Sequence, residues 1–357
     1  MKISIKEVAK ENQKARPTDE SSLGFGKVFT DYMFTMAYRE GQGWHNPVIG
    51  PYGPIAIDPA AQCLHYAQEI FEGMKAYRGG DGSIYLFRPF ENAKRMNASA
   101  RRMCMPEVDE SFFVEAATQL VLTERAWIPH TKGASLYIRP TMIATEAALG
   151  IQVPKEFLFF IVVCPVGAYY PEGFNPTRIY VSEDFIRSAP GGTGAAKAGA
   201  NYAVSLYGMR QANEMGYTQV LWLDAVERRF VEEVGTSNIF FMIDDELITP
   251  PLEGTILPGV MRNSVIRLAQ SWNIKVSERR IDINDVVAAA QNGTLKEVFA
   301  SGTAAVISPV GHISYRGTEY EINGGHAGPW AQKFYDELLA IQYGIAPDPF
   351  NWRIKIA

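Results

Sequence analysis

The chain has 357 residues, 47% of them hydrophobic and 20% charged, which is ordinary for a globular protein of two or three domains. Its formal net charge of -5, with no long block of either sign, excludes a polyanion-binding surface built from clustered Lys and Arg. No apolar run reaches membrane-spanning length and the first residues lack an apolar signal segment, so we expect a cytoplasmic protein. Its cysteines, odd in number, are expected to be buried free thiols: Cys63, Cys104 and Cys164.

The first half of the chain predicts an α+β arrangement after a polar arm of about twenty residues. Aromatic-rich and alternating stretches favour strands, and the apolar run at 157–164 is expected to pair with the stretch at 135–140. The expected strands are 28–38, 83–87, 135–140 and 157–164, and the expected helices are 91–103 and 111–128.

A segment rich in Gly, Pro and Tyr follows, and it marks a linker between two domains. Beyond it, strands alternate with helices, and a last helix opens at a proline. The expected strands are 178–181, a hairpin within 219–234, 238–243, 247–249 and 274–281, and the expected helices are 201–215, 260–272, 284–291 and 330–343.

A lysine in a run of small residues is the most distinctive feature of the sequence. Lys197 lies between Gly191-Gly-Thr-Gly-Ala-Ala and Ala-Gly-Ala-Asn-Tyr202. Small neighbours remove water from an amine, which lowers its pKa and makes it a nucleophile for Schiff-base chemistry. Taken alone, the stretch is equally compatible with a solvated lysine in a Gly-rich loop. A phosphate-binding P-loop is excluded, because alanines flank the lysine where that motif needs Gly and Ser or Thr.

Three later segments accompany this lysine. They are Phe230-Val-Glu-Glu-Val-Gly-Thr-Ser-Asn238, Leu257-Pro-Gly-Val-Met-Arg262 and Ala300-Ser-Gly-Thr-Ala-Ala305. In this order and spacing the segments resemble the fold type IV pyridoxal-phosphate aminotransferases, and most closely the long-form branched-chain amino acid aminotransferases. The resemblance runs from about Leu23 to near the C-terminus, and it is specific because several motifs must match together.

The resemblance implies a two-domain fold of the α+β and α/β classes. A small N-terminal α+β domain would cover 1–167, a linker 168–177, and a larger, cofactor-binding pseudo-barrel domain 178–357. It also implies a homodimer.

The resemblance assigns roles toward a pyridoxal 5′-phosphate cofactor. Lys197 would bind it covalently and shuttle the substrate proton, Tyr202 would hydrogen-bond its phenolic oxygen, and Glu233 would face its pyridine nitrogen. Glu232 is the adjacent alternative to Glu233, and strand alternation puts the two carboxylates on opposite faces. Without the resemblance, either would be taken for a solvated strand residue.

The cofactor phosphate has its own expected partners. Arg95 matches the arginine that pairs with it, a contact suited to a guanidinium, and the N–H groups of Val260 and Met261 would meet it at a helix start. Hydroxyls of Thr236 and Thr303 would lie near the ring and the phosphate. Only the register of the match selects Arg95, because other basic residues stand close by in the sequence.

The substrate pocket is expected to combine aromatic walls with a few polar groups, which suits both a branched side chain and glutamate. Without the resemblance, each aromatic residue would be taken for core. The matched residues are Phe25, Tyr66, Phe71, Tyr137, Arg139 and Tyr169, with the turn at Thr303 and Ala304 contacting the α-carboxylate.

The implied reaction is reversible transfer of the amino group of L-leucine, L-isoleucine or L-valine to 2-oxoglutarate, with small molecules and no nucleic acid or membrane as partners. The alternatives are a D-amino acid aminotransferase or aminodeoxychorismate lyase of the same fold, and a cofactor-binding protein without turnover. The histidines show no metal-ligand spacing, so no metal is expected. One departure stands out: Ala305 and Ser308 occupy the places of a redox-active C-x-x-C pair of the vertebrate long-form enzymes, so we expect no such switch.

Overall fold

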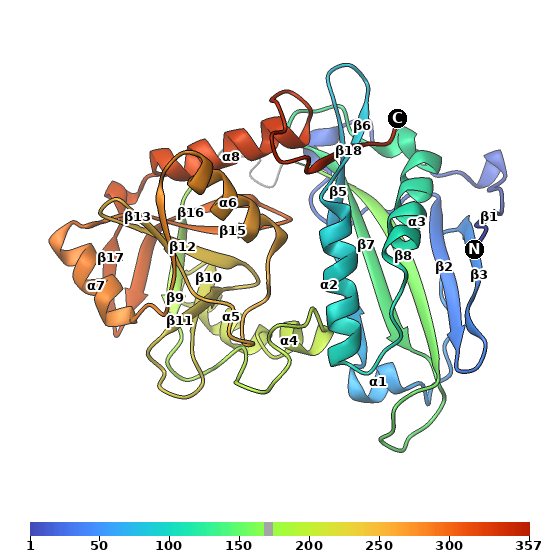
Figure 1. Ribbon diagram of the computed structural model, residues 1–357, viewed down its shortest axis with the longest axis horizontal. Coiled ribbons are helices and arrows are strands. Elements are labelled where there is room, and N and C mark those ends of the chain that lie inside the picture. The colour runs from blue at the N-terminus through green and yellow to red at the C-terminus, as the bar shows by residue number, and fades with distance from the viewer. Residues whose placement is uncertain (168–173) are drawn as a thin grey trace. The chain divides into compact units, whose positions relative to one another are not determined.

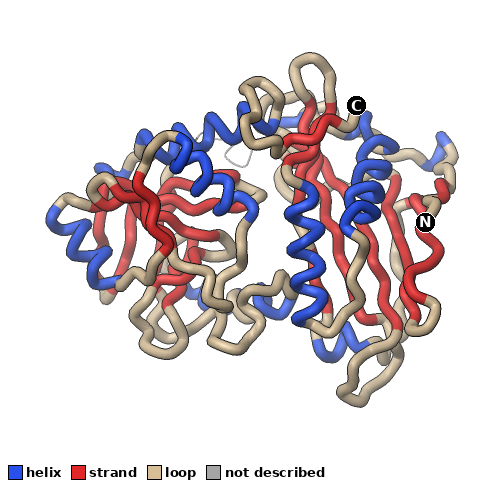
Figure 2. Tube along the Cα trace, in the orientation of Figure 1, coloured by secondary structure: helices blue, strands red, loops and turns tan. Residues whose placement is uncertain are grey.

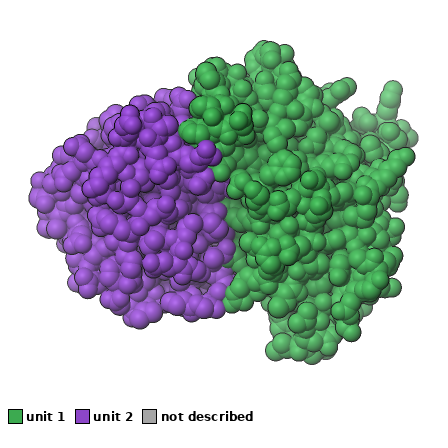
Figure 3. Space-filling view, viewed as in Figure 1, with its two compact units in different colours: residues 1–171, 196–200, 340–357 green, residues 172–195, 201–339 purple. Residues whose placement is uncertain are grey.

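The computed structural model describes residues 1–167 and 174–357 of the chain, which divides into two compact units (Figure 3). Unit 1 comprises Met1–Pro171, Ala196–Ala200 and Ala340–Ala357, and unit 2 comprises Glu172–Ala195 and Asn201–Leu339. The domain boundaries expected at 167 and 178 stay a prediction. The two units differ from them in that the Lys197 segment and the C-terminal residues belong to unit 1.

Unit 1 is built on one mixed sheet in the order β1-β3-β2-β8-β7-β5-β6-β18, with β4 paired to β7 (Figure 1). The expected pairing of the two apolar stretches is confirmed, since β7 and β8 run antiparallel with Tyr137 opposite Cys164. The strands are β1 (Ser4–Ile5), β2 (Tyr32–Arg39), β3 (Gly43–Pro51), β4 (Glu69–Phe71), β5 (Met74–Arg78), β6 (Ile84–Phe87), β7 (Ser135–Ala144), β8 (Glu156–Val166) and β18 (Arg353–Lys355).

Two helices, α2 (Pro89–Arg102) and α3 (Glu110–Thr123), lie side by side against this sheet, and a short α1 (Gln62–Tyr66) precedes β4 (Figures 1 and 2). Pro89 stands at the first turn of α2, where its missing N–H has no cost. Asp109 caps α3 by accepting a hydrogen bond from the N–H of Phe112. The core between sheet and helices includes Phe34, Phe113 and Phe159, all fully buried.

Unit 2 contains a sheet in the order β11-β10-β9-β16-β15-β12-β13-β14, with β17 paired to β16. Val234 and Ser237 exchange backbone hydrogen bonds at the turn from β11 to β12, so the edge strand β11 also meets β12 and the sheet curls back on itself. The strands are β9 (Thr177–Val181), β10 (Gln219–Leu223), β11 (Val231–Val234), β12 (Asn238–Ile243), β13 (Glu246–Thr249), β14 (Lys275–Glu278), β15 (Leu295–Gly302), β16 (Val306–Tyr315) and β17 (Thr318–Glu321).

The helices after the Lys197 segment are α4 (Gly199–Ala203), α5 (Leu206–Glu214), α6 (Val260–Ser271), α7 (Ile283–Asn292) and α8 (Pro329–Gln342). The single helix expected at 201–215 is wrong: α4 and α5 replace it. The break falls at Ser205, whose hydroxyl donates a hydrogen bond to the carbonyl of Tyr202, an alternative that serine side chains offer to a continuous helix.

The three cysteines are free, but the expectation that all are buried is wrong. Cys164 is buried and Cys63 is half-buried, whereas Cys104 is exposed. Cys104 lies just past the end of α2 with φ of 54°, at a turn where its side chain faces water.

Within the described ranges 1–167 and 174–357, we find no helix whose length and apolar character would suit a membrane crossing.

Candidate active site

Unit 1 holds the Lys197 segment against β4. The carbonyl of Lys197 accepts a hydrogen bond from the N–H of Phe71 at 3.0 Å, and its N–H donates to the hydroxyl of Ser99 on α2 at 2.9 Å. Ala196 and Ala198 are buried in the core of the unit, and Ala198 forms a bridge with Ile70. The alanines around the lysine are therefore explained by close packing of this segment on a strand.

The side chain of Lys197 is placed at an aromatic face. Its Nζ lies 4.8 Å from the centre of the Phe71 ring, and the residue is half-buried. A lysine held at a partly apolar surface is favourable for a nucleophile, because desolvation disfavours the ammonium form.

Arg95 differs from the basic residues near it in the sequence. It is 8% exposed and forms an ion pair with the fully buried Glu72, with 2.8 Å from Nε to Oε1. Lys94 and Arg101 instead make ion pairs with Glu91 and Glu107 at the surface. Burial opposes ionisation of Glu72, but the adjacent Arg95, together with the charge of Lys197, holds the pKa of this carboxyl below its usual value.

Four of the predicted substrate residues gather around β4 and β7. The rings of Phe25 and Tyr137 meet edge to face at 4.8 Å, and Arg139 donates a hydrogen bond to the Tyr137 hydroxyl at 3.1 Å. The Arg139 guanidinium also lies 4.7 Å from the centre of the Phe71 ring. Gly73 is needed here, because a Cβ at this position would overlap the Tyr137 hydroxyl.

The other two aromatic residues predicted for the substrate pocket are Tyr66 and Tyr169. Tyr66 lies at the surface, 42% exposed, next to His65, and its hydroxyl donates to the carbonyl of Leu149. Tyr169 lies outside the described residues.

Unit 2 surrounds Glu233 with hydrogen-bond donors. Its Oε1 accepts hydrogen bonds from the N–H of Leu257 at 2.8 Å and from Nδ2 of Asn238 at 3.2 Å. Its Oε2 lies 3.1 Å from Nε of Arg187, and both side chains of this pair are less than 8% exposed. The same Arg187 donates to the carbonyl of Thr255. A buried carboxylate with these two hydrogen bonds and this ion pair is held in one orientation.

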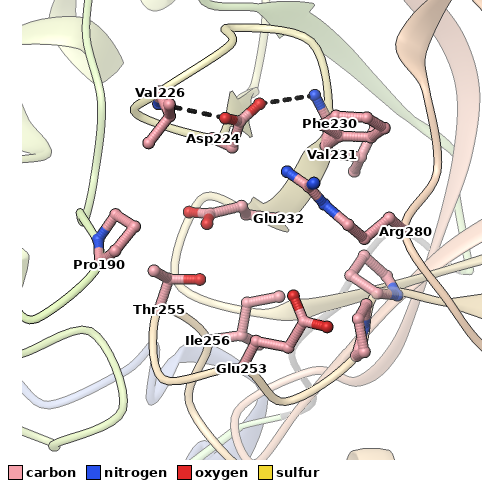
Figure 4. Close-up of a pocket in the computed structure, with 12 residues that line it drawn as sticks. Pro190, Asp224, Val226, Phe230, Val231, Glu232, Glu253, Thr255, Ile256 and Arg280 are labelled. Atoms are coloured by element: carbon pink, nitrogen blue, oxygen red, sulfur yellow. Dashed lines mark hydrogen bonds between the residues drawn. The ribbon is translucent and has the colours of Figure 1, made fainter.

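The side chain of Glu232 lies in different surroundings from that of Glu233. It lines a cavity of about 100 Å³ that also contacts Asp224, Thr255 and Arg280, and Figure 4 shows its carboxylate directed toward Thr255 and Pro190. Among the described residues, its Oε2 has no hydrogen-bond partner. Burial raises the pKa of Glu232, although Thr255 opposes this shift.

The turns that carry Thr236, Thr303 and Ala304, three further predicted site residues, meet at one end of the sheet of unit 2. Thr236 lies in the turn before β12, and Thr303 and Ala304 lie in the turn after β15. Because Asn238 of β12 is paired with Ser301 of β15, these two turns are neighbours.

The start of α6 lies at the same end of the sheet. Gly259 is its N-cap residue without a side-chain cap, and a Cβ on it would overlap the amide oxygen of Asn238. The first helical residues are Val260, half-exposed, and Met261, buried. Backbone N–H groups and the helix dipole at a helix start suit an anion such as a phosphate. Tyr202, in α4, is half-buried.

Sequence reasoning missed the charged partners of these residues. Glu72 and Arg187 were not among the expected site residues, because their roles depend on partners distant in the sequence. Lys75 was missed as well: it is 7% exposed in β5, directly opposite Tyr137, and burial lowers its pKa to about 8. Its sequence signal is a lysine between the apolar residues Met74 and Ala76 of a short strand.

Each unit by itself offers groups that suit part of an anionic aromatic aldehyde cofactor such as pyridoxal phosphate. Unit 1 offers a half-buried lysine and a buried arginine, and unit 2 offers a helix start with a glycine N-cap and an oriented carboxylate. In the part of the chain that the structure describes, no group of three or more His, Cys, Asp or Glu residues could hold a metal ion.

Comparison with known proteins agrees with this chemistry. Residues 69–313 match the family model described as amino-transferase class IV. The chain is 51% identical over 344 residues to branched-chain-amino-acid transaminase 1 of Bacillus subtilis, covering 96% of both chains. Among solved structures it resembles the branched-chain amino acid aminotransferase of Escherichia coli, with a TM-score of 0.76 and 25% identity over 92% of this chain and 99% of that one. It also resembles the branched-chain amino acid aminotransferase of Thermoproteus uzoniensis solved with norvaline, with a TM-score of 0.73 and 25% identity over 91% and 100%.

Proposed function

The chain belongs to the amino-transferase class IV family, with the fold type IV architecture, and from this premise we propose that it is a pyridoxal-phosphate-dependent branched-chain amino acid aminotransferase. It transfers the amino group of L-leucine, L-isoleucine or L-valine to 2-oxoglutarate, reversibly, giving L-glutamate. The observation that carries this proposal is the 51% identity to a Bacillus subtilis enzyme of that name over 96% of both chains.

The residues proposed to hold pyridoxal 5′-phosphate come from separate parts of the sequence. Lys197 would bind it covalently and Glu233 would pair with its pyridine nitrogen. When bound, the cofactor supplies an electron sink for the negative charge left at the amino acid Cα. The remaining contacts are proposed for Arg95, Tyr202, Thr236, Val260, Met261 and Thr303.

The chain's own groups would move and hold protons. The Lys197 amine takes the proton from the substrate Cα and keeps it near the reacting atoms, which is general base and then general acid catalysis. Glu233 favours a protonated pyridine nitrogen because a fixed anion lies beside it. The donors from Asn238, Leu257 and Arg187 support this proposal, since they keep the carboxylate oriented without reorganisation during the reaction.

The pocket residues would accept two kinds of substrate. The rings of Phe25, Phe71 and Tyr137 offer apolar surface to a branched side chain, whereas Arg139 and the Tyr137 hydroxyl offer donors to the second carboxylate of glutamate. The turn at Thr303 and Ala304 would contact the α-carboxylate. Tyr66 and Tyr169 complete the proposed pocket.

A substrate panel tests the proposal. The purified enzyme is supplied with 2-oxoglutarate and each of a set of L- and D-amino acids, and glutamate formation is followed, with Lys197→Ala as the inactive control. We expect activity with L-leucine, L-isoleucine and L-valine that the variant lacks. Activity restricted to D-amino acids would support the D-amino acid aminotransferase alternative, and no turnover with any of them would contradict the proposal.

The proposal includes a homodimer. Four large apolar side chains are exposed on two segments of unit 1 that the Tyr66–Leu149 hydrogen bond joins: Leu64, Leu149, Ile151 and Val153, at 60%, 65%, 87% and 63% exposure. Exposed apolar groups gathered in this way are typical of an interaction surface. Light scattering should give twice the chain mass, and Ile151→Asp should lower it, whereas Val226→Asp, a similarly exposed control in unit 2, should not. A monomeric native protein would contradict this part.

A cytoplasmic location is also proposed. Three free thiols are typical of a reducing compartment and support it. Cell fractionation with antibody detection tests it, and recovery in a secreted fraction would contradict it.

A further inference from the structure

Glu72 is a fully buried carboxylate at the end of β4. Its Oε1 accepts a hydrogen bond from Nε of Arg95 at 2.8 Å, and its Oε2 accepts from Nη2 of the same guanidinium at 2.8 Å. Oε2 also accepts from Nδ2 of Asn92 at 2.8 Å and from the N–H of Gly73 at 3.2 Å. A bidentate pair with this support has one geometry, because the guanidinium is planar and its donors are fixed in the plane.

The partners of Glu72 lie on one face of α2. Asn92, Arg95 and Ser99 are spaced by three and four residues, which places them one above the other along the helix. The first two bind Glu72, and the hydroxyl of Ser99 accepts the N–H of Lys197. A single helix face therefore contacts both the carboxylate and the lysine segment.

The strand before Glu72 holds the same segment from the other side. Ile70 forms a bridge with Ala198, and the N–H of Phe71 donates to the carbonyl of Lys197. Glu72 comes next along the chain, so one three-residue stretch fixes the backbone of the lysine and the side chain of the arginine. The relative placement of these two cations is then set within unit 1.

Charge explains why a carboxylate is tolerated there. An unpaired carboxylate in this interior would be neutralised, but Arg95 and Lys197 supply positive charge. Glutamine would keep one acceptor and the shape of the side chain, but it would lose the anionic fork that matches two N–H groups at once.

We infer that Glu72 is a positioning residue: by binding one edge of the Arg95 guanidinium, it sets the orientation in which this arginine meets the phosphate of the cofactor. This inference rests on the role proposed above for Arg95. It predicts that Glu72 contributes to recognition of the phosphate group and not to recognition of the pyridine ring.

Two ligands separate these contributions. The affinities of cofactor-free protein for pyridoxal 5′-phosphate and for pyridoxal, which lacks the phosphate, are measured for the wild type and for Glu72→Gln. Outer partners of binding groups typically contribute about 10- to 100-fold, and we expect about a tenfold loss for the phosphorylated ligand with less than about a twofold change for pyridoxal. Glu91→Gln, an exposed carboxylate on the same helix, is the matched control and should change neither affinity.

A second arginine variant tests whether Glu72 acts through Arg95. Arg95→Lys keeps the charge but loses the fork, so the double variant with Glu72→Gln should bind the phosphorylated ligand no more weakly than Arg95→Lys alone. Additive losses would overturn the inference, as would an unchanged preference for the phosphorylated ligand in Glu72→Gln.

The remaining outcomes are also decisive. If the wild type itself does not prefer the phosphorylated ligand, the proposed contact between Arg95 and the phosphate is wrong. The inference about Glu72, which rests on that contact, is then overturned with it. If Glu72→Gln does not fold, as judged by its thermal transition, Glu72→Asp replaces it, because aspartate keeps the charge and moves the carboxylate by one methylene. A reduced preference for phosphate in that variant supports the inference, and a full preference overturns it.

Discussion

The ion pair between Arg187 and Glu233 gives the sharpest stability prediction. Both side chains are less than 8% exposed. Removing one partner of a buried pair typically costs about 3–5 kcal/mol, because the other charge stays in the interior. We expect Arg187→Met to lower the free energy of unfolding by about 3 kcal/mol, near the lower end of that range. Glu233 keeps two hydrogen bonds from Asn238 and Leu257, which limits the loss.

Loss of the second contact of Arg187 adds little to the expected fall in the free energy of unfolding. Its bond to the carbonyl of Thr255 is lost in the variant, but the hydroxyl of Ser188 donates to the same oxygen at 2.8 Å. The carbonyl therefore stays bonded, and the cost of about 1–3 kcal/mol for an unsatisfied buried group does not apply.

The assay is urea unfolding of cofactor-free protein, so that cofactor affinity does not enter. Adding Glu233→Gln to Arg187→Met should recover part of the lost stability, because the buried charge that lost its arginine is removed. Arg39→Met is the control, since Arg39 is 63% exposed and its pair with Glu156 should contribute at most about 1 kcal/mol. Equal effects of Arg187→Met and the control, or additive effects in the double variant, would refute the reasoning.

Three further predictions concern carboxylates and thiols. Glu233→Gln should reduce turnover far more than amino acid binding, because the anion acts on charge that develops during the reaction; an equal loss in Glu232→Gln would contradict the assignment. Mild peroxide should leave the transamination rate largely unchanged, and iodoacetamide should label the exposed Cys104 before Cys164, whose pKa burial raises to about 11; a reductant-reversible loss of rate would argue against this. Burial raises the pKa of Glu124 from 4.5 to about 6, so the folded state favours its protonated form and this stabilisation is lost as pH rises through that window. Glu124→Gln should make the free energy of unfolding depend less on pH between 4.5 and about 6. An unchanged slope in this pH range would show that another group is responsible.

Elements with a strong local signal could be predicted from the sequence. The apolar run at 157–164 became β8, the largely apolar stretch at 238–243 became β12, and the start of α6 was marked by Pro258-Gly259. Elements whose bounds depend on tertiary contacts could not be predicted from the sequence. The three residues of β4 are too short for any periodicity, and the break between α4 and α5 depends on one serine hydroxyl.

In the candidate site, too, some residues could be predicted from the sequence and others could not. Lys197 was singled out by its run of small neighbours, Arg95 and Glu233 were selected by the register of the family resemblance, and all three stay proposed site residues. The side chains that orient them were not predictable, because Glu72 meets Arg95, and Arg187 meets Glu233, only when the chain has folded. Most arginines and glutamates of a globular protein are solvated, so composition alone gives no reason to pair these four.

The reactive lysine is proposed to be Lys197, and unit 1 also contains Lys75 as a competitor for this role. Lys75 is buried with a pKa lowered to about 8, as a nucleophilic amine would be, whereas Lys197 is half-buried at the Phe71 ring. Borohydride treatment of the cofactor-loaded enzyme, followed by peptide mass mapping, locates the lysine that carries the cofactor. We expect the pyridoxyl label on Lys197, and its absence in Lys197→Ala. A label on Lys75 or on any other lysine of the native protein would contradict this assignment.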